Sequence, residues 1–561
     1  MASLSSLLSI SPYSRGKNES SIPRNKRVSI NYVSCKASNG DNYQNPQPGG
    51  DSLSKFDRRN VLFGLGGLYG ATTLGGNKFT LAEDASLSPD VINCEKAIIP
   101  GSFMDCCPPK IKEIIDFIPP VVETPRVRPA VHLMTPTQIA DLERGIKMMI
   151  DLNKDKNDPR SFEHQAKVHC AYCNYAYTQI ESKSKANFQV HFNALFFPFH
   201  RAYLYFFERI LCDLIGKQAF AMPFWNWDSP PGMYMPEVYT KLGSPLYDTK
   251  RDERHQPPEL LFLNYDGKED HPFDIVDCNL RWMNKRMSVK TAKEFLGKLN
   301  KRNDTAMYEG SGSIEISPHN NVHNWVGDDM ANFHSTGNDP LFYAHHGNVD
   351  RMWNIWQNMD NEGDYTDQDW LDSSFVLYDE NQNAIRIKVS DCLDSGKLGY
   401  VYQDVEIPWL NTKQIPRAYP WIRTKDSEPP TIYFPQILDS DITTMVDRPS
   451  TRERMSEEEV LVLEDVEYDP TLPLHFNVLV NVGDEGEDVC PGNVEFVGTF
   501  RNIPHGLERH AKISSLRFVI TDVIEELGLE GEKDLAVKIV PTVNGHRIKI
   551  GGIKIQLESE E

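Results

Sequence analysis

The spacing of apolar residues divides the chain into a helical part followed by a β-rich part. Apolar positions recur with the period of an α-helix in five segments: 135–152, 161–180, 196–216, 288–300 and 339–359. After Asp369 the pattern changes to short apolar runs between polar and turn residues, as in 374–380, 384–389 and 400–407. The pattern predicts a mainly α domain over residues 86–410, with a four-helix bundle inside it.

The C-terminal quarter of the chain has the pattern of a small β domain. Six or seven short apolar runs, separated by turn residues, predict a sandwich-like all-β domain at 458–561. The preceding segment, 411–457, is rich in proline, aspartate and threonine and is predicted to be a linker. Residues 86–130 are proline-rich without periodicity, which is typical of an extended arm.

The first 85 residues have the composition of targeting signals, so they are excluded from the fold. Residues 1–40 are rich in serine and contain six Lys or Arg but only one acid, Glu19. Arg58 and Arg59 precede a short apolar, glycine-rich stretch, as in a twin-arginine signal. We expect import into the plastid (chloroplast), followed by export into the thylakoid lumen.

The net charge limits which partners the protein can bind, and its cysteines indicate which compartment it occupies. The 561-residue chain has a formal net charge of -21, which argues against nucleic acid and anionic membranes as partners. No apolar run reaches the length of about 18 residues that a membrane span needs. Cys94, Cys106, Cys107 and Cys170 occur early in the mature part, and an exported compartment permits disulfides. Four cysteines allow three pairings.

One group of histidines has the spacing of metal ligands. His319 and His323 are four residues apart, so on a helix they share a face and can bind one metal. His345 and His346 are neighbours that point about 100° apart on a helix. Only one of this pair can easily face the same centre, which then has three imidazoles.

His169, His191 and His200 form a second group. His191 is nine residues before His200, so the two cannot share a helix face and His191 should come from a preceding loop. Two three-imidazole sites on facing helices predict a dinuclear metal centre in a bundle core. Copper, zinc, iron and nickel all suit such ligands. The C-x-x-C of Cys170 and Cys173 leaves a zinc pair or a redox pair open at this point.

The histidines lie within longer motifs: VHCAYC, QVHFNALFFPFHR, PHNNVH and DPLFYAHHGNVDRMW, with PFWNWDSPPGM between them. Together these motifs resemble those of plant polyphenol oxidases, the catechol oxidases and tyrosinases of the type-3 copper proteins. The resemblance extends over essentially the whole chain. It implies a dicopper catalytic domain at 86–410 and a C-terminal domain that shields the site, so that the enzyme is latent until a protease cuts in 411–457.

The resemblance also implies which residues build the site. One copper (Cu A) would be held by His169, His191 and His200, and the other (Cu B) by His319, His323 and His346 rather than His345. Two disulfides are implied, Cys94–Cys107 and Cys106–Cys170. Cys173 resembles the cysteine whose sulfur is bonded to a ring carbon of a copper ligand, here His191, so the C-x-x-C is neither a zinc pair nor a redox pair.

Four further residues resemble family positions around the coppers. Phe333 resembles the gate aromatic, and Glu315 the acid that holds a water. Asn320 would activate that water with Glu315, and Asn324 is the other position that tunes substrate choice. The segment between His323 and His346 is shorter than in most plant members, which bears on gate geometry and not on the ligands.

The implied activity is oxidation of o-diphenols to o-quinones by O2, with hydroxylation of monophenols as an additional activity. Three other functions compete with it. A reversible O2 carrier would use the same six histidines, a dedicated aurone- or lignan-forming hydroxylase would use the same fold, and a copper-free binding protein would need neither. The substrates are O2 and small phenols, and an activating protease is the expected protein partner.

Overall fold

The computed structural model describes residues 86–180, 182, 185–302, 310–424, 429–450, 457–483, 489–506 and 511–558. The predicted targeting segment, 1–85, lies outside them. The described residues all belong to one structural unit. We call residues 86–415 the helical region and residues 436–558 the C-terminal β region.

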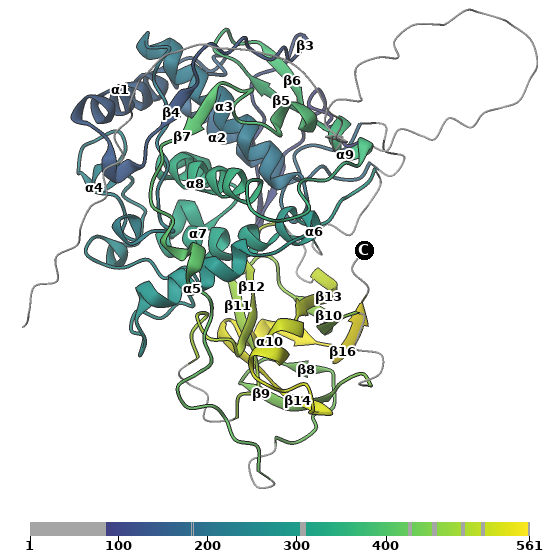
Figure 1. Cartoon of the computed structure of the whole chain (residues 1–561). Coiled ribbons are helices and arrows are strands. Elements are labelled where there is room, and N and C mark those ends of the chain that lie inside the picture. Colours follow the sequence, from purple (N-terminus) through teal and green to yellow (C-terminus); the bar gives the residue numbers. More distant parts are fainter. Residues whose placement is uncertain are drawn as a thin grey trace, which may run out of the picture. The chain divides into compact units, whose positions relative to one another are not determined.

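Helices make up most of the helical region (Figure 1). They are α1 (Pro136–Leu152), α2 (Phe162–Cys173), α3 (Phe196–Ile215), α4 (Glu237–Thr240), α5 (Ile275–Met287), α6 (Ala292–Leu296), α7 (Asn320–Val326), α8 (Leu341–Trp356) and α9 (Gln368–Asp372). A capping box at Thr135 begins α1, and Gly216, with φ 68°, ends α3. None of the described helices combines the length and apolarity that crossing a bilayer requires.

Helix α3 is the centre of the helical region. Almost every one of its residues is buried, which is the pattern of a helix surrounded by other elements rather than of a surface helix. It packs against α1 and α8. Buried histidines also lie on α2, α7 and α8, namely His169, His323 and His346. The helical bundle predicted from the sequence is therefore present.

Short strands connect the N-terminal arm to the rest of the helical region. They are β1 (Ala97–Ile99), β2 (Ser102–Met104), β3 (Ile114–Asp116), β4 (Arg126–Arg128), β5 (Ser374–Tyr378), β6 (Ala384–Lys388) and β7 (Tyr400–Tyr402). The arm strand β3 pairs in parallel with β6, and β4 with β7. Disulfides join Cys94 to Cys107 and Cys106 to Cys170, so the arm is fixed to α2 covalently.

The C-terminal β region consists of two sheets around their own apolar core. Its strands are β8 (Gln436–Ile437), β9 (Ile442–Asp447), β10 (Glu458–Tyr468), β11 (Leu474–Val480), β12 (Phe496–Asn502), β13 (Ala511–Val519), β14 (Asp534–Val543), β15 (Ile548–Ile550) and β16 (Gly552–Glu558). One sheet has the order β13-β10-β15-β8, with β16 also on β10, and the other has the order β12-β11-β14-β9. This is the sandwich-like domain that the sequence predicted.

The structure differs from the sequence expectations in three places. The segment 411–457 is not a linker throughout, because β8 and β9 lie within it and pair with β15 and β14. Helix α2 ends at Cys173, well before residue 180, because Tyr175 takes a positive φ of 61°. The run 516–523 is divided between β13 and the short helix α10 (Thr521–Glu526).

Candidate metal centre

Three histidines converge on one point in the core. His319 lies at the start of α7, His323 one turn further on, and His346 on α8. The Nε2 atoms of His319 and His323 are 3.0 Å apart, and each lies 3.3 Å from Nε2 of His346. Nitrogens that share a metal at about 2.0–2.1 Å with tetrahedral angles are about 3.3 Å apart. The three imidazoles therefore have the spacing of a metal site.

Carbonyl groups fix the direction in which several imidazoles present their lone pair. Nδ1 of His323 donates to the Met330 carbonyl at 2.8 Å, and Nδ1 of His200 donates to the Phe196 carbonyl at 2.8 Å. A carbonyl only accepts, so Nδ1 carries the proton and Nε2 carries the lone pair. Nε2 of His200 is buried and makes no hydrogen bond, as expected of a nitrogen that awaits a metal.

The second group is formed by α2, α3 and the loop between them. Ring centroids of His200 lie 5.6 Å from His169 and 5.1 Å from His191. His191 precedes α3, as its spacing from His200 predicted. Gln189 holds this loop, because its side chain accepts from the His191 amide and donates to the Cys173 carbonyl.

The Cys173 thiol lies among the histidines of this group. Its sulfur is 3.3 Å from Nε2 of His169, four residues earlier on α2. One ligand atom from each of His169, Cys173 and His191 fits within 4.8 Å of the others. The two histidine groups adjoin each other, with the rings of His200 and His346 stacked at 4.1 Å.

Burial keeps the imidazoles neutral. It lowers the pKa of His200 to about 3 and that of His323 to about 4. The pKa values of the other four are also lowered well below the ordinary value, first by burial and then by neighbouring histidines; they are His169, His191, His319 and His346. Neutral imidazole is the form that binds a metal, so the site is ready for one at neutral pH.

Phe333 lies against the second group. Its ring stacks on His191 with 4.3 Å between centroids and 22° between planes, while its carbonyl accepts from Nδ1 of His169 at 3.2 Å. The side chain is 2% exposed. Phe333 therefore contacts two of the histidines, one through its ring and one through its main chain.

Glu315 and Asn320 lie beside His319. The Glu315 carboxylate accepts from the Phe192 amide at 2.6 Å through Oε1, while its buried Oε2 makes no hydrogen bond. Burial raises the pKa of Glu315 to about 8. Nδ1 of His319 donates to Oδ1 of Asn320 at 3.0 Å. Asn324 does not reach the histidines by a hydrogen bond in the described structure; its amide donates to the Asn320 carbonyl.

A buried ion cluster fixes α3 to α8 below the histidines. Asp350, one turn after His346, accepts from Arg201 at 2.5 Å and from the hydroxyl groups of Tyr400 and Tyr402 at 2.6 and 2.5 Å. Arg128 of β4 lies 3.4 Å from the same carboxylate. Sequence analysis did not reveal this charge cluster, because its residues come from distant parts of the chain.

The turn between β12 and β13 covers Phe333. This turn, Ile503–Gly506, places the ring of His505 5.7 Å from Phe333 and 5.4 Å from Phe192. His505 is buried, and its amide donates to the Pro470 carbonyl at 2.9 Å. Sequence analysis missed His505, because the aromatic residues that it contacts are far away in the chain.

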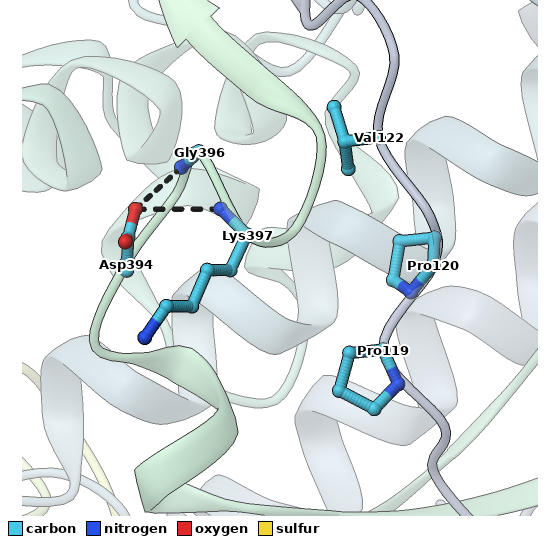
Figure 2. Close-up of a pocket in the computed structure, with 6 residues that line it drawn as sticks. All are labelled: Pro119, Pro120, Val122, Asp394, Gly396 and Lys397. Atoms are coloured by element: carbon cyan, nitrogen blue, oxygen red, sulfur yellow. Dashed lines mark hydrogen bonds between the residues drawn. The ribbon is translucent and has the colours of Figure 1, made fainter. Parts of the chain in front are cut away.

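A separate hollow lies away from these residues (Figure 2). It has a volume of about 370 Å³, and it is lined by Pro119, Pro120, Val122, Asp394, Gly396 and Lys397. The Asp394 carboxylate accepts from the amides of Gly396 and Lys397, which makes a local turn. None of the predicted site residues lines this hollow, so it is not part of the metal centre.

Comparison with known families identifies the chain. Residues 159–359 match the common central domain of tyrosinase, 364–415 the polyphenol oxidase middle domain, and 434–557 the chloroplastic polyphenol oxidase C-terminal domain. A chloroplastic polyphenol oxidase from Malus domestica is 42% identical over 98% of this chain and 96% of the relative. The chain belongs to the plant polyphenol oxidase family. This confirms the resemblance seen in the sequence.

The similarity to relatives and to solved structures extends over both the helical region and the C-terminal β region. The (+)-larreatricin hydroxylase of Larrea tridentata is 43% identical over 100% of both chains. Latent apple tyrosinase has a TM-score of 0.72 at 42% identity, covering 80% of this chain and 100% of that chain. A latent aurone synthase has a TM-score of 0.77 at 35% identity, covering 84% and 99%.

This polyphenol oxidase has the donor set that its family's coppers need. The two groups of buried, neutral imidazoles fit Cu A and Cu B, since imidazole nitrogens suit copper and no carboxylate lies among the described ligand groups. The chain is therefore an oxidoreductase with a dicopper centre.

Proposed function

We propose that this chain oxidises o-diphenols to o-quinones. Two diphenols each release two electrons and two protons to one O2, which yields two quinones and two waters. The observation that carries the proposal is the pair of buried histidine groups, whose neutral nitrogens converge in a chain of the polyphenol oxidase family. When bound, the coppers supply the redox chemistry with O2.

The proposed ligands are His169, His191 and His200 for one copper, and His319, His323 and His346 for the other. The alternative for the last position is His345. Its Nδ1 accepts from the Trp227 indole at 3.1 Å, so the proton of a neutral ring must sit on Nε2. His345 then has no lone pair left for a metal, whereas Nε2 of His346 lies in the nitrogen triangle.

The chain's own residues orient the phenol and move its protons. The Phe333 ring, stacked on His191, supplies an aromatic surface beside one copper ligand. Oε1 of Glu315 accepts from the Phe192 amide, which leaves Oε2 as the oxygen that can carry a carboxyl proton. With a pKa raised to about 8, this group can accept or release a proton near neutral pH.

Monophenol hydroxylation is the finer part of the proposal. Glu315 is the group near His319 that could receive a phenolic proton through a water, and Asn320, whose Oδ1 accepts from His319, could help to orient that water. The name of the Larrea relative, a larreatricin hydroxylase, and that of the Antirrhinum majus relative, an aureusidin synthase 41% identical, support the alternative of a dedicated hydroxylase.

We further propose that Cys173 is bonded through sulfur to a ring carbon of His191. Such a thioether would hold a ligand that no helix fixes. The loop position of His191 and the shared 4.8 Å cluster support it. Because the Cys173 sulfur also lies 3.3 Å from Nε2 of His169, peptide mapping must distinguish the two rings.

Latency is proposed to come from the turn Ile503–Gly506. His505 covers Phe333, and Phe333 covers His191, so a phenol cannot reach this face while the C-terminal β region is in place. Relatives include a polyphenol oxidase latent form from Prunus armeniaca, 44% identical over 90% of this chain. Cleavage by a protease between 411 and 457 would release the β region, and 416–435, before β8, is the best placed part.

The proposed location is the plastid. Relatives over nearly the whole chain are named chloroplastic, and residues 1–85 have the composition of a plastid signal. Export into the thylakoid lumen rests on Arg58 and Arg59 and the apolar stretch after them.

Oxygen uptake tests the function. The copper-loaded chain is assayed with a catechol and with the matching monophenol, before and after limited proteolysis. Uptake with catechol that rises on proteolysis is expected. Uptake with catechol alone would remove the role of Glu315 and Asn320 in hydroxylation. No uptake with either phenol, with two coppers bound, would refute the general activity and favour the dedicated hydroxylase.

A further inference from the structure

Two buried cysteines meet where the C-terminal β region contacts α5. Cys278 lies on α5, and Cys490 lies in the segment that leads to β12. They are 1% and 8% exposed, and together with Phe262 they form a separate small apolar cluster. Cys278 belongs to the helical region and Cys490 to the C-terminal β region, so this contact joins parts of the chain that are distant in sequence.

Gly492 shows how closely the two residues approach. A Cβ atom added at this glycine would lie 3.1 Å from Sγ of Cys490 and 3.2 Å from Cα of Cys278. The sulfur of one cysteine and the main chain of the other thus both lie close to the same point. The Gly492 amide also donates to the Cys490 sulfur at 3.2 Å, which fixes the side-chain direction.

We propose that Cys278 and Cys490 form a disulfide that ties the C-terminal β region to the helical region. Both are thiols in the structure, in contrast to the two disulfides of the arm. Three other buried thiols lie among the described residues: Cys173 contacts His169, and Cys212 and Cys392 donate to carbonyl groups.

The oxidation is a thiol–disulfide exchange with a small disulfide such as oxidised glutathione. The Cys490 thiolate attacks one sulfur and releases a glutathione thiolate; the Cys278 thiolate then attacks the Cys490 sulfur and releases the second. Two thiols become one disulfide, and two glutathiones are formed. A hydrogen bond from the Cys278 thiol lowers the pKa of Cys490, which favours Cys490 as the first nucleophile.

The tether lies beside the point where the chain leaves the helical region. The Gln414 amide donates to the carbonyls of Pro491 and Asn493 at 2.7 and 2.8 Å, and Ile415 forms a bridge with Asn493. A cut after Ile415 would therefore leave the new end next to Cys490. With the disulfide formed, the β region would stay bound after cleavage, and the site would open only after reduction. This consequence, unlike the disulfide itself, rests on the proposed latency.

Electrophoresis of the cleaved chain tests the tether. The full chain is incubated with oxidised glutathione, cut by limited proteolysis after residue 415, alkylated and separated without reductant. The two fragments on either side of the cut should migrate as one species, and reductant should shift them to two. C278S and C490S should give two species without reductant, and C212S, which removes a buried thiol elsewhere, should behave as the wild type.

Peptide mapping of the unsubstituted chain keeps the test independent of folding of the variants. A peptide joining Cys278 to Cys490 is expected. If both cysteines are alkylated after the oxidation and the cut wild type gives two species, the tether is refuted. Neither readout uses activity, so a linked chain that does not oxidise catechol would refute the proposed function and leave the tether standing. In an active enzyme, cleaved C278S should take up O2 without reductant, whereas the cleaved wild type should need it.

Discussion

Nε2 of His319 lies 3.0 Å from Nε2 of His323, and both rings present a carbonyl-fixed Nδ1–H on their far side. Two nitrogen lone pairs at this separation repel each other unless a cation lies between them. The fold brings the two together through one turn of α7 and holds them there by main-chain acceptors. The repulsion between these lone pairs therefore lowers the stability of the fold until a metal ion binds between them.

Copper removal should lower the stability of the chain. A ligand that binds only the folded state at about 1,000 times its Kd stabilises by about 4 kcal/mol. Thermal unfolding with and without a chelator measures the difference. An unchanged Tm, with copper loss verified by metal analysis, would contradict the assignment of these histidines to a metal site.

His323→Ala should lose one of the two coppers, whereas His345→Gln should keep both. His323 contributes a lone pair to the nitrogen triangle, while the Trp227 indole occupies Nδ1 of His345. Glutamine at 345 retains an acceptor for the indole. The copper content of each purified variant is measured by metal analysis. Loss of copper from H345Q alone would show that His345, and not His346, is the third ligand.

Asp350→Asn should destabilise the chain by about 3–5 kcal/mol, because two buried arginines would lose the negative charge between them. The matched control is Asp394→Asn in the turn of Figure 2, where the carboxylate only accepts from two amides. Urea unfolding measures both. Equal effects would mean that the charge of Asp350 does not stabilise the contact between α3 and α8.

The contact between the two regions should strengthen as pH rises. The half-buried Lys285 ammonium donates to the Phe496 carbonyl. Burial and the nearby charge of Arg286 lower the pKa of Lys285 to about 7, although Glu526 and Asp522 of α10 act in the opposite direction. Between about pH 7 and 10.5 the folded state therefore binds fewer protons than the unfolded chain, so stability rises with pH in this window. Below it, the penalty of the buried charge is fully present.

Lys285→Met should flatten this pH dependence, and Lys397→Met, on the lining of the hollow in Figure 2, should not. The free energy of unfolding at several pH values measures the slope. The same slope in wild type and K285M would show that another group is responsible.

Glu315→Gln should reduce uptake of O2 with the monophenol much more than with the catechol. Glutamine keeps an oxygen for the Phe192 amide but cannot receive a proton. Rates with the two phenols, at equal copper content, measure the ratio. Equal losses would assign Glu315 a positioning role for the loop that carries His191.

Sequence reasoning recovered the segments that carry the clustered histidines because their signals are local. An i, i+4 pair, the helical spacing of the apolar residues in α3 and the nine-residue spacing that requires a loop for His191 all follow from helix geometry. It failed where long-range contacts decide. The start of the C-terminal β region at β8 depends on pairing with β15, more than a hundred residues later, which no local pattern reveals.

The covering turn illustrates the same limit. NIPHGLERH, in which His505 lies, reads as an ordinary turn with proline and glycine. Its meaning arises only when β12 and β13 bring it onto Phe333. The pairing of Cys278 with Cys490 was likewise invisible, since neither residue has a cysteine near it in the sequence.

Phe333 stacks its ring on His191, and its carbonyl accepts from His169, one of the proposed copper ligands. The carbonyl belongs to the main chain, so any amino acid at position 333 would supply it. Position 333 can therefore diversify during evolution, with new ring shapes admitting new phenols, while the hydrogen bond that orients His169 is inherited unchanged.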